Sequence, residues 1–241
     1  MSGTTAKSSR HIGIVGCSAE GAALCYRTIC IEGAGLLGPH AHPEVSLHTP
    51  SLADYVACIE RGDLAGIADL MLASAEKLAK IGADFLICPD NTIHQAFDLV
   101  APRSPLPWLH IAEVVADEAK ARGHACLALL GTKSLTDSEV YPEALAAWGL
   151  TCLKPGEAER REIDRIIMEE LVYGRFEAGS TADMIHTLDR LKGQGAEGAI
   201  LGCTELPLVL DNSNAPLPTL DSTRLLARAA LKHAVASDAL T

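Results

Sequence analysis

A motif that occurs twice constrains this chain more than any other feature. Residues 82–92 and 195–205 both begin with Gly-Ala and an acidic residue, continue as a short apolar segment, and reach a polar tripeptide eight residues after the glycine. The first tripeptide is Asp90-Asn91-Thr92 and the second is Cys203-Thr204-Glu205. Asp90 therefore corresponds to Cys203 at an offset of 113 residues, and the key position differs between the two copies.

A second pair of segments repeats at nearly the same offset. Residues 12–18 resemble residues 127–134, and Gly16 matches Gly131 at an offset of 115 residues. Two matches at nearly one spacing predict two similar halves that face each other. A cleft between such halves would carry one reactive side chain on each wall, which suits chemistry on both faces of a carbon atom.

Apolar segments that end in glycine or small polar residues alternate with segments of helical periodicity. This alternation is typical of a parallel-sheet α/β protein, and continuously apolar strands indicate a sheet that is covered on both faces. The expected strands are 11–15, 44–48, 84–88, 107–109, 125–130, 151–153, 198–201 and 217–220. The expected helices are 21–31, 65–81, 111–122, 139–148, 157–174, 181–194 and 223–235.

We therefore predict an α/β fold of two pseudo-symmetric domains, each a mainly parallel sheet flanked by helices, with the active site in the cleft between them. The first domain is expected over residues 11–105 together with 212–241, and the second over residues 106–211. Residues 1–10 are small and polar, without the apolar stretch of a signal peptide, so we expect a disordered tail there and a cytoplasmic protein.

Composition and charge exclude several classes of partner. Of the 241 residues 48% are hydrophobic, which is enough for a sizeable core, and no run of 18 apolar residues suggests a transmembrane helix. The formal net charge of −11 argues against binding to nucleic acid or to anionic membranes. The eight cysteines include no C-x-x-C pair, so most are expected to be small buried side chains, and only Cys203 has a context that suggests chemistry.

Four of the predicted strands end in small polar residues. These exits are Gly16-Cys17-Ser18, Asp90-Asn91-Thr92, Gly131-Thr132-Lys133-Ser134 and Cys203-Thr204-Glu205. Ligands of parallel sheets bind at the carboxyl ends of the strands, where backbone N–H groups at helix starts favour anions. The sequence contains no G-x-G-x-x-G or G-x-x-x-x-G-K-[ST] pattern, so the expected ligand is a small carboxylate and not a phosphate.

At these exits the chain resembles the aspartate/glutamate racemase family over nearly its whole length after residue 11. The resemblance is carried by 202–205, by 91–94, by Leu130-Gly131-Thr132, by Tyr141, by 195–197 and by the long helix from Glu157 to Arg175. It implies a cofactor-independent amino-acid racemase without a metal, often a homodimer, that acts on an amino acid or a related carboxylic acid. It also implies that the substrate α-carboxylate is held by Asn91, Thr92, Thr132, Ser134 and Thr204.

The mechanism implied by the resemblance uses two cysteines on opposite faces of the α-carbon, and here Asp90 takes the place of the first. Cys203 is expected to be the catalytic thiol, with a pKa lowered by its position at a helix start. Asp90 has three interpretations. It is a base whose pKa burial raises toward neutrality, or a group that binds an ammonium or hydroxyl, or a turn residue in an inactive homologue.

Four further residues are candidates for substrate binding: Ser18, Glu205, His48 and His94. His94 follows Thr92 by two residues and either tunes Asp90, binds substrate or caps the next helix. His48 is expected at a strand end beside the pocket. A metal site with His40, His42 and His48 is disfavoured, because only Glu44 lies nearby as a further ligand. Lys133 is expected to form a surface ion pair.

The side chain of the substrate is only partly constrained by the sequence. A distal carboxylate needs a cation, and residues 54–55 and 172–173, where the family resemblance would place one, carry none, although Arg61 and Arg175 lie close in sequence. We therefore predict that aspartate is not the best substrate. Two alternatives stay open, a one-cysteine decarboxylase or isomerase of a small carboxylic acid and an inactive amino-acid-binding homologue.

Overall fold

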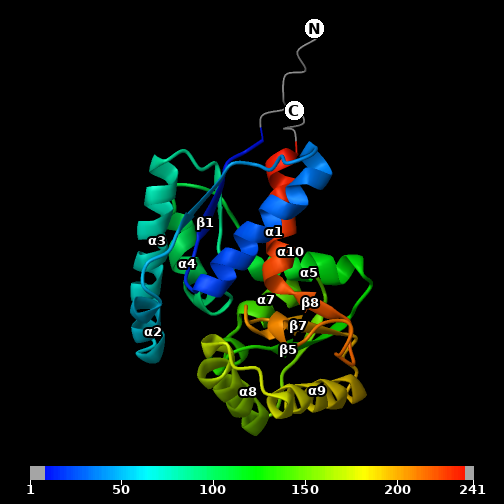
Figure 1. The fold of residues 1–241 in the computed structure, drawn as a ribbon. Coiled ribbons are helices and arrows are strands. Elements are labelled where there is room, and N and C mark those ends of the chain that lie inside the picture. The colour runs from blue at the N-terminus through cyan, green and yellow to red at the C-terminus, as the bar shows by residue number, and fades with distance from the viewer. Residues whose placement is uncertain (1–8, 237–241) are drawn as a thin grey trace.

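Two four-stranded parallel sheets organise residues 9–236, the part of the chain that this computed structural model describes (Figure 1). The first sheet has the order β2 (Val45–His48), β1 (Ile12–Val15), β3 (Phe85–Ile87) and β4 (Trp108–Leu109). The second has the order β6 (Thr151–Leu153), β5 (Cys126–Leu130), β7 (Gly198–Leu201) and β8 (Thr219–Asp221). All neighbouring strands are parallel, and both sheets use the same order, which confirms two similar α/β halves.

The eight expected strands are all present in the described chain, and the helices depart more from expectation. The α-helices are α1 (Ala19–Leu37), α2 (Leu52–Glu60), α3 (Leu64–Lys80), α4 (Phe97–Val100), α5 (Ile111–Ala121), α6 (Lys133–Asp137), α7 (Val140–Ala147), α8 (Glu157–Glu169), α9 (Ala178–Gly193) and α10 (Ser222–Val235). Short 3₁₀ turns cover Thr92–Ala96, Ala101–Arg103, Leu171–Tyr173 and Leu206–Leu208. Helix α2 was not predicted, and the helix expected to reach residue 174 ends at Glu169 before a 3₁₀ turn.

Both faces of each sheet are covered, as the continuously apolar strands predict. Alternate strand residues point to opposite faces, so Leu86 packs with α2 and α3 while its neighbour Ile87 packs with α1 and α10. In the second sheet Ala199 faces α8 and α9, and Ile200 faces α5 and α7. The result is four apolar layers, built largely from Ala, Ile, Leu and Val, around two sheets.

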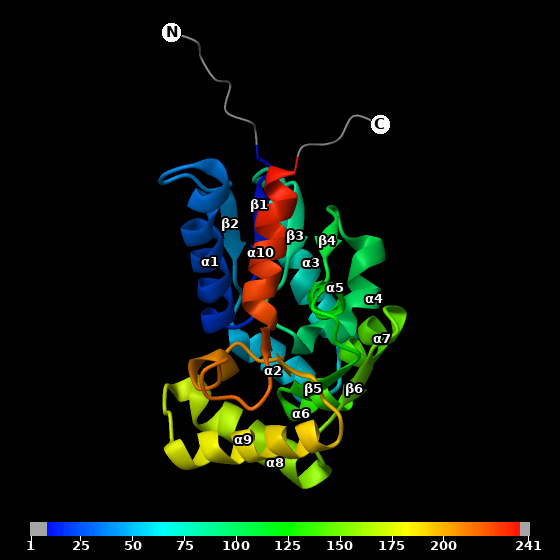
Figure 2. The ribbon, with the colours of Figure 1, turned by 90° about the vertical axis from the view of Figure 1, so that its right-hand side faces the viewer.

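Two helices, α5 and α10, pack against both sheets, so the domain boundaries expected from the sequence do not coincide with the sheets. Helix α10 packs against α1 and α5 (Figures 1 and 2), with Leu226 in the core of the first sheet and Leu225 in that of the second. Helix α5 divides its face in the same way through Ile111 and Ala112. Strand β4 belongs to the first sheet and β8 to the second, so the boundaries expected after residues 105 and 211 do not follow the sheets.

The repeated Gly-Ala-acid motif has the same structural role in both halves. The Asp84 carboxylate accepts a hydrogen bond of 2.6 Å from the backbone N–H of His11, at the start of the neighbouring strand. The Glu197 carboxylate accepts one of 2.5 Å from the backbone N–H of Ala125. Gly82 and Gly195 both have positive φ, at 92° and 107°, which favours glycine. The repeat therefore fixes the register of the central strands in each half.

The beginning of the described chain is held in place. The backbone N–H of Arg10 donates to the carbonyl of Ala234 in α10, so this residue of the expected tail is ordered. Residues 1–8 lie outside the described residues. None of the helices in the described part is both long and apolar enough to span a membrane.

Candidate active site

A cavity of about 830 Å³ lies where the carboxyl ends of the two sheets meet. Residues from all four polar strand exits line it, and so do residues of α2 and α8. The exits contact each other in two similar pairs. The Thr92 and Thr132 hydroxyls lie 3.0 Å apart, and the Ser18 and Thr204 hydroxyls lie 3.5 Å apart. Each pair joins one exit of the first sheet to one of the second, which matches the pseudo-symmetry of the sequence repeat.

Asp90 lies at the exit of β3 on the wall formed by the first sheet. Its two carboxylate oxygens accept hydrogen bonds from the backbone N–H groups of Cys17 at 3.0 Å and Ser18 at 3.1 Å, at the exit of β1. Burial, with a smaller contribution from the charge of Glu205, raises the pKa of Asp90 to about 6 against the lowering effect of these hydrogen bonds. A carboxylate with this pKa is a competent base near neutral pH.

Cys203 lies at the exit of β7 on the opposite wall. Its thiol donates to Oε2 of Glu205 at 2.9 Å, and the Thr204 hydroxyl donates to the same oxygen at 2.8 Å. Burial, and then the negative charge of Glu205, raise the pKa of Cys203 well above its ordinary value. The prediction of a lowered pKa is therefore wrong, because burial and a carboxylate outweigh the helix-start effect. The thiol holds its proton at neutral pH.

Asn91 is held rigidly between the two halves. Its side-chain Oδ1 accepts from the Tyr141 hydroxyl at 2.6 Å, and its Nδ2 donates to the Ser222 hydroxyl at 3.0 Å. Ser222 in turn donates to the carbonyl of Leu201, the last residue of β7. Because Asn91 precedes Thr92 directly, this network fixes the hydroxyl that meets Thr132. Small polar groups thus converge on the cavity from rigid supports.

Most of the predicted site residues line the cavity. Asp90, Cys203, Asn91, Thr92, Thr132, Ser134, Thr204, Glu205 and Ser18 all do so. His48 and His94 do not belong to the lining. His48 contacts Ser74 and Lys77 at the side of the first sheet, and His94 lies behind Asp90, with its ring 2.9 Å from the Asp90 carbonyl.

His94 supports the site from outside the cavity. Burial, together with neighbouring His110, holds the pKa of His94 well below its ordinary value, so the ring is neutral. Its contact is with the backbone of Asp90, at the carbonyl oxygen, and not with the carboxylate. Within residues 9–236 no group of three His, Cys, Asp or Glu side chains is arranged to hold a metal ion.

Two features of the site escaped the sequence analysis. Cys17 lines the cavity beside Asp90, and burial raises the pKa of its thiol. Gly21 lies at the contact between the walls: a Cβ there would meet the Thr204 methyl at 2.5 Å and the Ser18 hydroxyl at 2.9 Å. The sequence signal for both is the polar exit after the first strand, from which the sequence analysis selects only Ser18 as a substrate-binding candidate.

Comparison with known proteins identifies the family to which the chain belongs. A family model described as Asp/Glu/hydantoin racemase matches residues 12–230, and thus nearly the whole described chain. The chain belongs to the Asp/Glu/hydantoin racemase family. The resemblance expected from the strand exits is confirmed, and so is the α/β fold of two facing parallel sheets. An amino-acid isomerase is the activity that the family suggests.

Individual relatives agree with this membership. The chain is 27% identical over 158 residues to the broad specificity amino-acid racemase RacX of Bacillus subtilis (strain 168), which covers 66% of this chain and 68% of RacX. The structure of a candidate Asp/Glu racemase from Yersinia pestis matches with a TM-score of 0.87 and 29% identity, over 94% of this chain and all of that one. An aspartate racemase homologue from Pyrococcus horikoshii OT3 matches with a TM-score of 0.80 and 28% identity, over 93% and 99% of the two chains.

Proposed function

We propose that this chain is a cofactor-independent amino-acid racemase or epimerase in which Asp90 and Cys203 move the α-proton on opposite faces of the substrate. The observation that carries the proposal is the pairing across one cavity of a carboxyl with a pKa of about 6 and a thiol that keeps its proton. At neutral pH the two groups are therefore ready as base and acid, and no metal or pyridoxal phosphate enters the proposal.

The proton transfers balance within the cavity. The Asp90 carboxylate takes the α-proton, so the C–H bond breaks and an O–H bond forms, and the electron pair moves onto the substrate carboxylate as an enediolate. The Cys203 thiol then gives its S–H proton to the opposite face of the α-carbon. Hydroxyls and the amide of Asn91, Thr92, Thr132 and Ser134 hold the substrate carboxylate and stabilise the developing charge.

The reverse reaction needs a thiolate at Cys203 and a proton on Asp90. Glu205 is placed to accept the thiol proton, because its carboxylate oxygen already lies 2.9 Å from the sulfur. Transfer from S–H to the Glu205 carboxylate creates the thiolate without a free hydroxide, and Asp90, with a pKa of about 6, takes its proton from solvent. We therefore assign Glu205 the role of holding the Cys203 proton, in addition to the Thr204 hydroxyl that it positions.

Aspartate is not the preferred substrate in this proposal. Lys133 is the one basic side chain in the cavity lining, and it forms an ion pair with Asp137. Arg61 pairs with Asp63, and Arg175 donates to the carbonyl of Glu169, outside the lining. A second substrate carboxylate would therefore enter the cavity without a cation to neutralise it, which is unfavourable.

Exchange of the α-proton in D₂O, followed by NMR across L- and D-amino acids, tests the function. We expect exchange with inversion in the wild-type protein and a loss of about 10²–10⁴-fold in Cys203→Ser and in Asp90→Asn. Cys30→Ser, a partly exposed cysteine of α1 outside the cavity lining, is the matched control and should retain activity. Exchange without inversion would contradict the two-base scheme and make Asp90 a binding group.

Assembly is a separate part of the proposal. We also propose a homodimer in the cytoplasm, which rests on the family resemblance alone. Light scattering of the purified chain gives its mass in solution, and a value of 25.4 kDa would refute the dimer.

A further inference from the structure

A side-chain amide of the first half binds a hydroxyl of the second half at the edge of the cavity. Gln95 lies in the 3₁₀ turn Thr92–Ala96, which follows the exit of β3, and it does not belong to the cavity lining. Its Nε2 donates hydrogen bonds to the carbonyl of Thr92 at 2.9 Å and to the hydroxyl of Ser134 at 3.0 Å. Thr92 and Ser134 both line the cavity, so this amide connects a polar exit of each sheet.

The contact with Thr92 determines which way the amide faces. A carbonyl oxygen only accepts hydrogen bonds, so the part of the Gln95 amide that faces it is the NH₂ group. The second hydrogen of this NH₂ group is directed at Ser134, whose oxygen accepts it. A hydroxyl that accepts from an NH₂ group must direct its own O–H elsewhere. Gln95 therefore leaves the Ser134 O–H as a donor to some other acceptor.

The cavity is the place for that acceptor. Ser134 lines the cavity, and within residues 9–236 its hydroxyl donates to no protein group. The Thr132 hydroxyl, two residues earlier, accepts from the N–H of Leu135 at 3.2 Å and lies 3.0 Å from the hydroxyl of Thr92. Hydroxyls of both halves thus lie together at the joined exits. A carboxylate only accepts hydrogen bonds, so it suits a hydroxyl whose proton is available.

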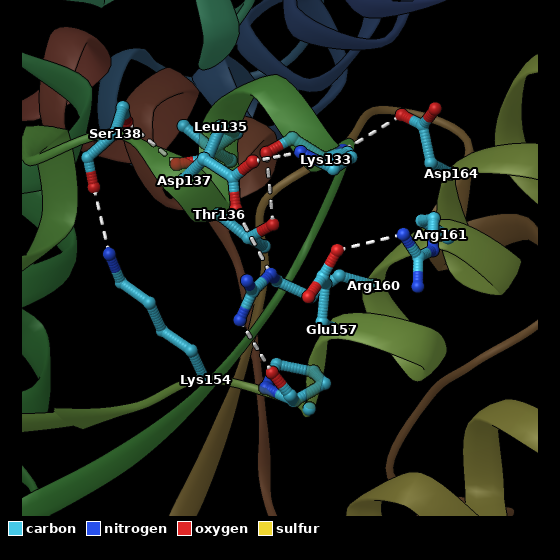
Figure 3. A network of polar contacts seen from close by, with 12 residues as sticks. Lys133, Leu135, Thr136, Asp137, Ser138, Lys154, Glu157, Arg160, Arg161 and Asp164 are labelled. Carbon is cyan, nitrogen blue, oxygen red and sulfur yellow. Dashed lines mark hydrogen bonds and ion pairs between the residues drawn. The ribbon is translucent and has the colours of Figure 1, made fainter.

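Charged residues hold the turn that carries Ser134 from its other side (Figure 3). At the start of α6 the backbone N–H of Lys133 donates to Asp164 at 2.8 Å. After the end of α6 the carbonyl of Ser138 accepts from the ammonium group of Lys154 at 2.9 Å. Because both ends of this five-residue helix are held, its backbone has little freedom, and the amide determines chiefly the direction of the hydroxyl.

We propose that Gln95 is a positioning residue, which directs the O–H of Ser134 into the cavity as a donor to the substrate carboxylate. Gln95 does not touch the substrate and acts only through Ser134. The carboxylate gains negative charge when the α-proton leaves, and a hydroxyl that is already directed at it stabilises this charge without reorientation. This inference rests on the proposed function, since it concerns how that site holds the carboxylate.

Two substitutions of Gln95 distinguish orientation from packing. Gln95→Glu retains the size and shape of the side chain, but its carboxylate accepts the Ser134 proton and turns the O–H away from the cavity. Gln95→Met removes the donor and leaves the O–H free to rotate. Alanine is the probe, because it is the smallest chiral α-amino acid. At pH 8 we expect kcat/KM for its α-proton exchange to fall about 10–100-fold in Gln95→Glu and less than about tenfold in Gln95→Met.

The order of the two variants is decisive. If Gln95 only filled space, glutamate, which has the same shape, would be the milder substitution. A larger loss in Gln95→Met than in Gln95→Glu would therefore overturn the proposal. Gln194→Glu, the same substitution at the exposed residue that follows α9, is the matched control and should leave exchange unchanged.

A double-mutant cycle with Ser134→Ala tests that the effect passes through this hydroxyl. In the Ser134→Ala background there is no O–H to redirect, so Gln95→Glu should lower kcat/KM by no more than about threefold. An equal loss from Gln95→Glu in both backgrounds would refute the role of Ser134 and attribute the effect to the added charge.

A binding measurement separates this inference from the proposed function. Calorimetric titration compares alanine with alaninamide, which lacks the carboxylate, in the Cys203→Ser chain with and without Gln95→Glu. Gln95→Glu should weaken the binding of alanine at least about tenfold and change that of alaninamide by less than about threefold. This result would support the inference even if no amino acid exchanged its α-proton, which would refute only the racemase. Alanine affinity that Gln95→Glu leaves unchanged, or that never exceeds the affinity for alaninamide, would refute the inference and leave the racemase intact.

Discussion

Replacing the Asp90 carboxylate by a neutral side chain should make the free energy of unfolding less dependent on pH. The size of this effect follows from the pKa of Asp90 in the folded chain. Burial raises the pKa of the Asp90 carboxyl from 3.8 to about 6 in the folded chain. One pKa unit corresponds to about 1.4 kcal/mol, so the ionised form destabilises the folded state by about 3 kcal/mol relative to the protonated form. The substitution Asp90→Asn removes this penalty and retains one acceptor for the N–H groups of Cys17 and Ser18.

The sign follows from the direction of the shift. Below pH 3.8 the carboxyl is protonated in both the folded and the unfolded chain, and its full contribution to stability is present. As the pH rises from about 3.8 to about 6, the unfolded chain loses the proton that the folded chain still holds, so the free energy of unfolding falls, and the loss is complete above the folded-state pKa. Between pH 4 and pH 7.5 the wild-type protein should therefore lose about 2.4 kcal/mol relative to Asp90→Asn.

Urea unfolding at a series of pH values, followed by tryptophan fluorescence and circular dichroism, measures this difference. The lost acceptor of Asn shifts all values of the variant by about 1–3 kcal/mol, but this shift does not depend on pH, so it leaves the slope unchanged. Asp117→Asn, on the exposed side of α5, is the control variant: it removes one carboxyl that is not buried. A wild-type minus Asp90→Asn difference that stays constant from pH 4 to pH 7.5 would refute the argument that burial raises this pKa.

Three further predictions concern the site. The pH profile of kcat/KM for α-proton exchange should rise with an apparent pKa of about 6, and the rise should disappear in Asp90→Asn; a profile flat from pH 5 to pH 8 would argue against Asp90 as the base. Gly21→Ala should reduce exchange by about 10²-fold in steady-state assays, because its Cβ would displace Thr204 and separate the walls; unchanged exchange would show that they tolerate this shift. Tyr141→Phe should lower the free energy of unfolding by about 1–3 kcal/mol, measured with urea, because the buried Oδ1 of Asn91 loses its donor; a neutral effect would show that another donor replaces it.

Much of the fold could be derived from the sequence because two signals agree: the alternation of apolar strands with helical segments, and the repeated Gly-Ala-acid motif. The apolar strands are short and continuous, and the structure contains all eight within two residues of the expected bounds. The Gly-Ala-acid repeat gave the two halves independently, and its acids, Asp84 and Glu197, make equivalent contacts. Because parallel strands present their carboxyl ends at one edge, the two polar exits of each sheet lie side by side. The two edges face each other, so most predicted site residues line the same cavity.

The parts that sequence analysis missed depend on tertiary contacts. Helix α2 is only nine residues long, and its apolar residues at 52, 55, 56 and 59 follow a helical spacing that the sequence analysis did not use. The pKa of Cys203 depends on burial and on a carboxylate two residues along the chain whose direction no spacing rule gives. The boundary residues around β4 and β8 were misplaced because α5 and α10 pack against both sheets, and a linear division of the chain cannot represent a shared helix.

Replacing one thiol by a carboxyl has a kinetic consequence that a symmetric pair of thiols lacks. In the free protein at neutral pH, Asp90 is largely ionised and Cys203 is protonated, so one protonation state dominates. The enantiomer whose α-proton faces Asp90 meets a site that is ready. Its mirror image needs a thiolate at Cys203, which is left after a turnover from the Asp90 side or is formed by proton transfer to Glu205. Free enantiomers have equal energies, so kcat/KM must be equal in both directions. The difference between the two directions must therefore appear in kcat and KM separately. At saturating substrate, loss of Glu205 should lower kcat more for the enantiomer whose α-proton is taken by Cys203 than for the enantiomer whose α-proton is taken by Asp90.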